Sequence, residues 1–292
     1  MKNTHYKKRT VFSALRGIWH WLSIHLLGKT FTDFRIPALD LVFRVPSNTI
    51  FGWHLSKYRI YEANSLHFLR NHFKLGQSGL FVDVGANFGW YTLIFSQFAG
   101  PQGRVIALEP DVSNYRLLIH NQNTNAATNI TTLQFAAGRE NAKLVLGKAP
   151  DTNPGMHSLV DLPHVNKTQG GQVVHVRTLD NLLAPYLGYI ELMKMDIEGY
   201  EIAALDGASE TLKRCKMVLI EYSPAFIQAA GDNKQKFFDI FIAAGFDFYE
   251  IHADKLIPLT KELRKQLIER SDDPMYWQQD FFCINRHLVH QS

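Results

Sequence analysis

The sequence predicts a doubly wound α/β domain, in which helices cover both faces of a mostly parallel sheet. Short apolar runs alternate with helix-length segments, a pattern typical of parallel strands that are buried on both faces. The predicted strands are 80–84, 104–108, 131–136, 189–195 and 216–222. Helix-length segments follow most of them, at 89–98, 111–126, 200–213 and 224–244. Two later apolar runs predict an antiparallel C-terminal hairpin at the sheet edge, 245–252 and 279–286.

Composition places the chain among ordinary globular proteins. Its 292 residues are 46% hydrophobic and 20% charged, which suits one large domain with an appendage and excludes disordered or collagen-like chains. Two cysteines, Cys215 and Cys283, are too few for a disulfide scaffold. We therefore expect a reduced, cytoplasmic setting.

Positive charge is concentrated at the beginning of the chain. Residues 1–32 contain six lysines and arginines and no acid, whereas the rest has 25 bases against 27 acids. Because the body is slightly acidic, it lacks the basic surface of a nucleic-acid-binding domain. We expect no nucleic-acid partner.

Residues 1–36 predict a basic, amphipathic, helical N-terminal extension ahead of the main domain, 37–292. Apolar residues recur at helical spacing on one side: Val11, Leu15, Ile18, Trp19, Leu22 and Leu26. Polar residues occupy the other side: Ser13, Arg16, His20 and Ser23. The apolar run is interrupted, and it is shorter than the roughly 20 residues of a membrane span. Two interpretations remain open: peripheral contact with an anionic inner membrane face through Trp19 and Trp21, or packing on the chain's own domain.

The segment FVDVGANFGW, residues 81–90, predicts a cofactor-binding turn between a strand and a helix. Gly85 and Gly89 let the backbone approach a ligand at a partly positive helix N-terminus. Glu109, at the end of the next strand, can accept hydrogen bonds from both ribose hydroxyls of a nucleoside. Asp83 would repel a pyrophosphate but suits a cationic amino-acid tail. These residues favour S-adenosylmethionine over a nicotinamide dinucleotide.

Five ordered segments resemble the FkbM-type S-adenosylmethionine-dependent methyltransferases: FVDVGANFGWYTL, GRVIALEP, TLDNL, MKMDIEGYEIAALDGA and VLIEYSP. The resemblance covers a core at 61–250 and implies the class I, Rossmann-like methyltransferase fold, with seven strands of which the last form the hairpin. It implies methyl transfer to a hydroxyl of a sugar, glycan or related secondary metabolite. The family pattern assigns Asp83, Gly85, Asn87 and Gly89 to the first cofactor loop and Glu109 to the ribose. At the adenine position this chain offers only Ala136, Ala137 and Gly138.

The segment LMKMDIEGYE contains the strongest candidates for catalysis. Lys194, Asp196 and Glu198 alternate, so on an extended strand they share one face at its carboxyl end. Asp196 ranks first as base or acceptor-positioning acid, Glu198 second, and Lys194 is their charge partner. We expect Glu201 to face solvent. Asp196 and Glu198, with Glu221, could hold a divalent cation, but the spacing does not demand one and we predict none.

A long connection at about 139–177 predicts an insertion that shapes the acceptor site. It contains His157 in the turn-rich stretch NPGMHSL, and a neutral imidazole there is the alternative base. Three functions are weighed: an O-methyltransferase, a catalytically inactive membrane-surface adaptor that retains the methyltransferase fold, and a nicotinamide oxidoreductase. The acids Asp83 and Glu109 favour the first and disfavour the third.

Overall fold

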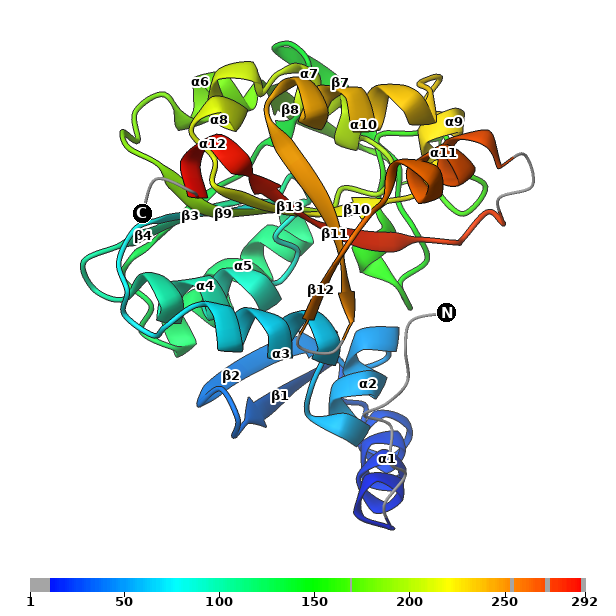
Figure 1. The fold of residues 1–292 in the computed structure, drawn as a ribbon. Helices are drawn as coiled ribbons and strands as arrows, with labels where there is room; N and C mark the ends of the chain where they lie inside the picture. Colours follow the sequence, from blue (N-terminus) through cyan, green and yellow to red (C-terminus); the bar gives the residue numbers. More distant parts are fainter. Residues whose placement is uncertain (1–10, 169, 253–254, 271–273, 290–292) are drawn as a thin grey trace.

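The fold is a three-layer α/β arrangement, in which one large sheet lies between two layers of helices (Figure 1). A computed structural model describes residues 11–168, 170–252, 255–270 and 274–289. The order of strands across the sheet is β12-β11-β13-β10-β9-β3-β4-β5. Because the chain runs outward from β3 in one direction and then restarts at β9 in the other, the sheet is doubly wound, as predicted.

Five neighbouring strands of this sheet are parallel: β3 (Leu80–Val84), β4 (Arg104–Leu108), β5 (Ile130–Leu133), β9 (Ile190–Met195) and β10 (Met217–Tyr222). The remaining three complete the edge: β11 (Phe246–His252), β12 (Lys255–Pro258) and β13 (Gln279–Asn285). As expected, β11 and β13 pair antiparallel. They are not adjacent in the chain, however, because β12 forms the direct hairpin with β11 and makes an eighth strand. The sequence Lys255–Pro258 is too short to show a strand period, so the pattern predicted only seven.

Alternating residues of the strands face two separate apolar cores. Phe81 packs toward α3 (Ala63–His72) and α4 (Trp90–Ala99), while Val82 packs into the core beneath the opposite helical layer. The remaining helices of the main domain are α5 (Val112–Thr124), α6 (Leu179–Leu183), α7 (Glu201–Asp206), α8 (Ser209–Lys213), α9 (Pro224–Ala229), α10 (Lys234–Ala243), α11 (Lys261–Glu269) and α12 (Arg286–Val289). Two predicted helices are thus each split in two, with Gly207 ending α7 and left-handed Gly231 following α9.

The N-terminal part adds a helix, a hairpin and a second helix beneath the α3–α5 layer (Figure 1). Its elements are α1 (Val11–His25), β1 (Phe31–Ile36), β2 (Leu41–Pro46) and α2 (Ile50–Tyr58). The helix predicted between Val11 and Leu26 is therefore present, but residues 31–36 form a strand that pairs with β2. Residue 36, the expected boundary, lies inside this hairpin.

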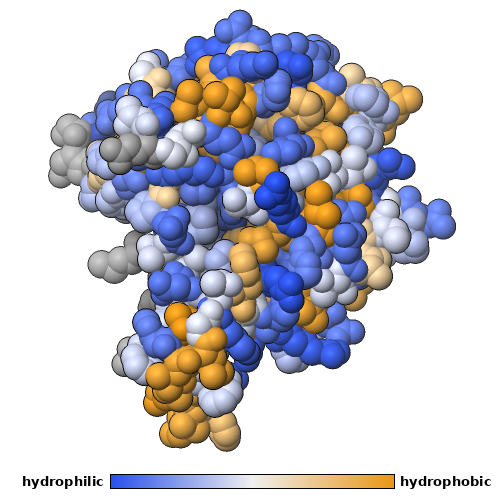
Figure 2. Space-filling model, turned by 180° about the vertical axis from the view of Figure 1, so that it is seen from behind, coloured by the Kyte–Doolittle hydropathy of each residue, from blue (hydrophilic) through white to orange (hydrophobic). Residues whose placement is uncertain are grey.

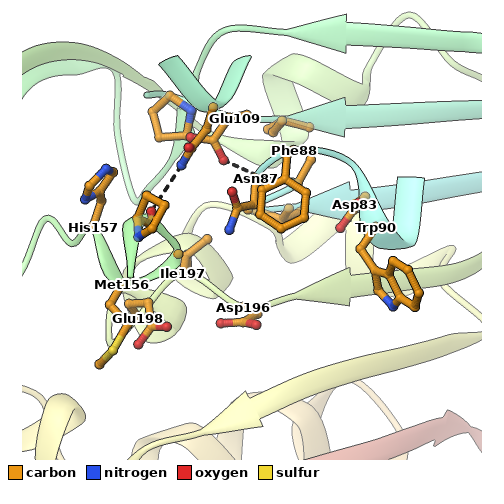
Figure 3. A pocket seen from close by; sticks show the side chains of 18 of the residues that line it. Asp83, Asn87, Phe88, Trp90, Glu109, Met156, His157, Asp196, Ile197 and Glu198 are labelled. Carbon is orange, nitrogen blue, oxygen red and sulfur yellow. Dashed lines mark hydrogen bonds between the residues drawn. The ribbon is translucent and has the colours of Figure 1, made fainter. Parts of the chain in front are cut away.

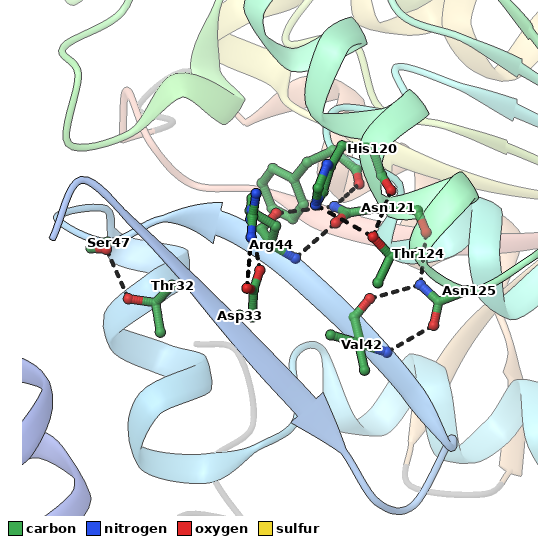
Figure 4. Close-up of polar contacts among 10 residues, drawn as sticks. Thr32, Asp33, Val42, Arg44, Ser47, His120, Asn121, Thr124 and Asn125 are labelled. Atoms are coloured by element: carbon green, nitrogen blue, oxygen red, sulfur yellow. Dashed lines mark hydrogen bonds and ion pairs between the residues drawn. The ribbon is translucent and has the colours of Figure 1, made fainter.

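Two asparagines, Asn121 in α5 and Asn125 at its C-cap, attach the hairpin to the main domain by bonding to the backbone of β2 as a neighbouring strand would (Figure 4). Asn125 accepts from the Val42 amide at 2.8 Å and donates to the Val42 carbonyl at 2.7 Å. Asn121 makes the same pair with Arg44, at 2.7 and 3.0 Å. Asn121 also donates to the Phe88 carbonyl at 2.8 Å, so one side chain joins the hairpin to the predicted cofactor turn.

The predicted insertion contributes two strands, β7 (Ala142–Leu146) and β8 (Gln172–Arg177), to a second small sheet beside the main one. The third strand, β6 (Ala136–Ala137), comes just before the insertion, and the order is β6-β8-β7. Between β7 and β8 the 3-10 turn η1 (Pro154–Met156) brings His157 toward the carboxyl ends of the main strands. Within the described ranges, no helix is both long enough and apolar enough to cross a membrane.

Candidate active site

A pocket of about 280 Å³ lies at the carboxyl ends of β3, β4, β9 and β10 (Figure 3). Eight of the nine predicted site residues line it: Asp83, Gly85, Asn87, Glu109, His157, Lys194, Asp196 and Glu198. The ninth, Gly89, is the N-cap of α4 just behind the turn. Figure 3 shows Glu109 and Asn87 on one side of the pocket and Asp196 and Glu198 on the other.

The turn after β3 requires glycine at its first position. Gly85 has φ +82°, and a Cβ there would overlap the carbonyl oxygen of Asp196. The amides of Gly85 and Ala86 both donate to the Leu108 carbonyl, at 3.0 and 2.8 Å. The turn is therefore held between the ends of β4 and β9, with no room for a side chain.

Asp83 presents a buried carboxylate oxygen without a protein partner. Its side chain is 1% exposed, and Oδ2 accepts from Thr92 Oγ1 at 2.5 Å. Oδ1 is buried and has no hydrogen-bond partner among the described residues. Burial raises the pKa of Asp83, and the positive charge of Lys194 opposes that rise. A cationic ligand group in this pocket would compensate the buried oxygen.

Glu109 is fixed by the backbone on both oxygens. Oε2 accepts from the Asn87 amide and Oε1 from the Asp111 amide, each at 2.8 Å. Burial raises the pKa of Glu109 to about 8, against the opposing effect of the Asn87 amide. Each carboxylate oxygen can accept a further bond, so the side chain is preorganised for a pair of ligand hydroxyls.

Lys194 is a buried cation between two acids. Its Nζ lies 3.1 Å from Asp196 Oδ2 and 5.2 Å from the centre of the Tyr91 ring. Burial acts to lower the pKa of Lys194, but Asp196 and then Asp83 outweigh it, so the pKa is raised. Lys194 therefore stays charged beside Asp196, and its electrostatic role in the site stays a prediction.

Three carboxylates meet opposite the Glu109 side. Asp196, Glu198 and Glu221 each offer an oxygen, and these oxygens lie within 4.8 Å of one another. Gln278 Nε2 donates to Glu221 Oε1 at 2.8 Å and to Glu198 Oε2 at 3.3 Å. Carboxylate oxygens suit a divalent cation. In this structure, however, Lys194 contacts one oxygen of Asp196, and Gln278 contacts one oxygen each of Glu198 and Glu221.

Glu198 takes a strained backbone conformation to reach the pocket. Its φ is +53°, and Gly199 beside it has φ +96°. Ser158 Oγ donates to the Glu198 carbonyl at 2.7 Å, and Glu201 Oε1 accepts from the amides of Ile197 and Gly199 at 2.9 and 3.3 Å. Glu201 is thus buried and organises this turn, which corrects the expectation that it faces solvent; the amides left unpaired by the turn draw its carboxylate inward.

The surroundings of His157 disfavour its expected role as a base. Its Nδ1 accepts a hydrogen bond from the Ala149 amide at 2.9 Å, so the neutral ring carries its proton on Nε2. Burial and then the nearby Lys148 charge lower the pKa of His157 to about 4. The lone pair on Nδ1, which a base would use to accept a proton, already accepts the Ala149 amide. The ring is therefore suited to donate a hydrogen bond from Nε2.

Sequence reasoning missed several residues that line the pocket. Tyr61 and Glu62 come from the loop before α3, and the Tyr91 hydroxyl donates to Glu62. Gln278 precedes β13, about eighty positions beyond Glu198 in the chain. Glu221 could be found from the sequence, because it lies at the carboxyl end of a predicted strand. Gln278 and Glu62 lie in loops and follow no sequence pattern that would place them in the pocket.

Comparison with known proteins agrees with this geometry. The model of the methyltransferase FkbM domain matches residues 83–267, which include the turn, Glu109 and the three-carboxylate cluster. The chain belongs to this family. A protein called Methyltransferase 1, from Beauveria bassiana, is 29% identical over 147 residues, covering 44% of this chain and 58% of that protein.

The similarity to solved structures is lower. The methyltransferase FkbM of Methylobacillus flagellatus KT is 18% identical with a TM-score of 0.44, covering 76% of this chain and 47% of that one. Fibrillarin of Aeropyrum pernix, solved with natively bound S-adenosyl-L-methionine, is 11% identical with a TM-score of 0.38, covering 72% of this chain and 67% of that one. The present chain thus spans about half the length of the solved FkbM protein from Methylobacillus flagellatus KT.

Proposed function

We propose that this FkbM-family chain is an S-adenosylmethionine-dependent O-methyltransferase. The observation that carries the proposal is the pairing, in one pocket, of an unpartnered buried oxygen on Asp83 with the backbone-held carboxyl of Glu109. The first suits a cationic amino-acid tail and the second a ribose diol. The glycine turn lies between these two acids, and a Cβ on Gly85 would displace it because that atom would overlap the Asp196 carbonyl.

The residues of the pocket divide the binding task. Asp83 and the turn Gly85–Gly89 would hold the methionine portion, and Glu109 would hold the ribose. Apolar Ala136 and Ala137 line the pocket where adenine contacts are expected, without a polar side chain of their own. When bound, S-adenosylmethionine supplies a methyl group activated by a positively charged sulfur.

Asp196 is our candidate for the group that receives the acceptor's proton. It lies at the end of β9, and its partner Lys194 keeps a positive charge 3.1 Å away. A hydroxyl loses its proton as its oxygen attacks a methyl carbon, so a carboxylate in reach assists and aligns the attack. Glu198 ranks second, and His157 serves as a hydrogen-bond donor from Nε2.

The acceptor side favours a hydroxyl compound of the sugar or glycan class. Glu198, Glu221 and Gln278 place several acceptors and donors along one wall, a chemistry that suits a compound with neighbouring hydroxyls. The loop containing Met156 and His157 covers the same pocket. Cys215 and Cys283 are buried free thiols, and we propose a reducing, cytoplasmic location on that basis.

Transfer of labelled methyl from S-adenosylmethionine to a panel of sugars, glycans and glycosylated metabolites tests the proposal. We expect Asp196→Asn to lower turnover by about 10²- to 10⁴-fold, the usual contribution of a positioned base, with cofactor affinity retained. Glu198→Gln serves as the matched comparison and should lower turnover less. Unchanged turnover in Asp196→Asn would refute the assignment of the base.

An inactive membrane-surface adaptor is the second candidate, and the exposed apolar face of α1 favours it. That function predicts binding to anionic vesicles without affinity for S-adenosylmethionine. Cofactor binding together with methyl transfer would exclude it.

A further inference from the structure

Helix α1 packs on its own domain through its small and polar face. Ser13, Gly17, His20 and Ser23 are the buried residues of the helix. His20 Nε2 lies 2.9 Å from the Ser47 carbonyl, and its ring stands edge-on to Trp53 at 4.9 Å. This face is held by specific polar contacts, so its orientation on the domain is defined.

The apolar face of α1 is consequently turned to solvent. We call this the outer face; its residues are between 48% and 75% exposed: Val11, Phe12, Leu15, Ile18, Trp19 and Trp21. Figure 2 shows the resulting apolar patch over the protruding end of the molecule, and Leu26 and Leu27 beyond the helix extend it. Single exposed apolar residues are common on soluble proteins, whereas a contiguous apolar patch of this kind, with two tryptophans, marks a binding surface.

The part of the sequence that contains α1 is positively charged. Residues 1–32 contain six bases and no acid, and two of these bases, Arg16 and Lys29, lie in the described part of the chain. Arg16 Nη2 donates to the Lys57 carbonyl. Burial lowers the pKa of Arg59, and the positive charge of Arg16 lowers it further. Two copies of such a surface would repel each other, whereas anionic lipid headgroups would attract it.

We propose that the outer face of α1 binds an anionic membrane surface, with the helix lying in the plane of the headgroups. Tryptophans at the border between headgroup and acyl chain, with bases around them, are typical of such interfacial helices. This binding is independent of methyl transfer, so each can fail without the other.

The docked helix would bring the pocket close to the lipid surface. His20 attaches α1 to Ser47, and two residues later Thr49 begins the stretch that lines the pocket with Ile50 and Phe51. Ile50 is 59% exposed, and its amide donates to the Thr152 carbonyl of the insertion at 2.8 Å. A hydroxyl carried by a membrane amphiphile would reach the site from this side.

Vesicle flotation of the full chain tests the proposal. Vesicles of phosphatidylcholine with phosphatidylglycerol should carry the protein, and added salt should weaken the binding. The outer-face triple variant Leu15→Ser, Ile18→Ser, Trp19→Ser should bind at least about tenfold more weakly. The control triple removes exposed apolar residues elsewhere, Leu75→Ser, Val173→Ser and Leu187→Ser, and should bind like the wild type.

Circular dichroism and thermal unfolding show whether the triple variant keeps its fold, and none of its three substituted residues lines the pocket. Equal vesicle binding by the wild type and the outer-face variant would overturn the proposal. So would absence of wild-type binding, or a wild-type dimer that becomes monomeric in the variant, since the outer face would then belong to a second copy.

Discussion

Glu109 should make nucleoside binding depend on pH in a way that can be calculated. Burial raises its pKa to about 8 in the free protein, so the carboxyl is mostly neutral at pH 7. Ribose hydroxyls donate to the charged form, so the bound pKa is lower and binding releases a proton. The affinity therefore rises as the pH rises toward 8 and levels off above it.

The magnitude follows from the two protonation states. Because the nucleoside binds the charged form, a free pKa of about 8 makes the affinity at pH 9 about tenfold that at pH 7, roughly 1.4 kcal/mol. The ligand for this assay is 5′-methylthioadenosine, which has the ribose and adenine but neither charged group. Its dissociation constant is measured calorimetrically across this range.

Matched variants assign the pH effect to one residue. Glu109→Gln should bind weakly with no pH dependence, because the titrating group is gone. Glu201→Gln removes a similarly buried carboxyl that accepts two backbone amides but lies outside the pocket, and it should keep the wild-type slope. A flat wild-type profile, or a slope that persists in Glu109→Gln, would refute the reasoning.

Two further perturbations test the scaffold of the site. Gly85→Ala should abolish measurable cofactor affinity in calorimetry, because the added Cβ would overlap the Asp196 carbonyl. Gly231→Ala is the matched control: Gly231 has φ +79° and open space around it, so this variant should lose only about 1–3 kcal/mol of stability and keep its affinity. Asn121→Ala should lower the free energy of unfolding by about 1–3 kcal/mol in urea titrations, because the Arg44 amide loses its partner; equal stability would show that the hairpin is held by other contacts.

Much of the cofactor side could be predicted from the sequence, because its residues lie in one strand–turn–helix unit and at the end of the next strand. Asp83, Gly85 and Glu109 need only the order of parallel strands to be brought together. Their roles remain predictions. The acceptor wall could not be predicted to the same extent, because Gln278 and Glu62 reach it from loops whose positions depend on the complete fold.

The N-terminal helix shows another limit of periodicity. The spacing of Leu15 and Ile18 identifies two faces, but it does not say which one packs on the domain. His20 decides this, because its ring meets the Ser47 carbonyl and Trp53, which belong to segments more than twenty-five residues away. The helix packs on the domain through its polar face and its apolar face stays exposed, so contact with a membrane stays a prediction.

The central claim is that the pocket binds S-adenosylmethionine, and calorimetric titration of the full chain tests it most directly. We expect micromolar binding of S-adenosylmethionine and of its demethylated product, weakened at least about tenfold in Glu109→Ala, and no binding of NADH. Binding of NADH, or no binding of either sulfur nucleoside by the folded protein, would contradict the account.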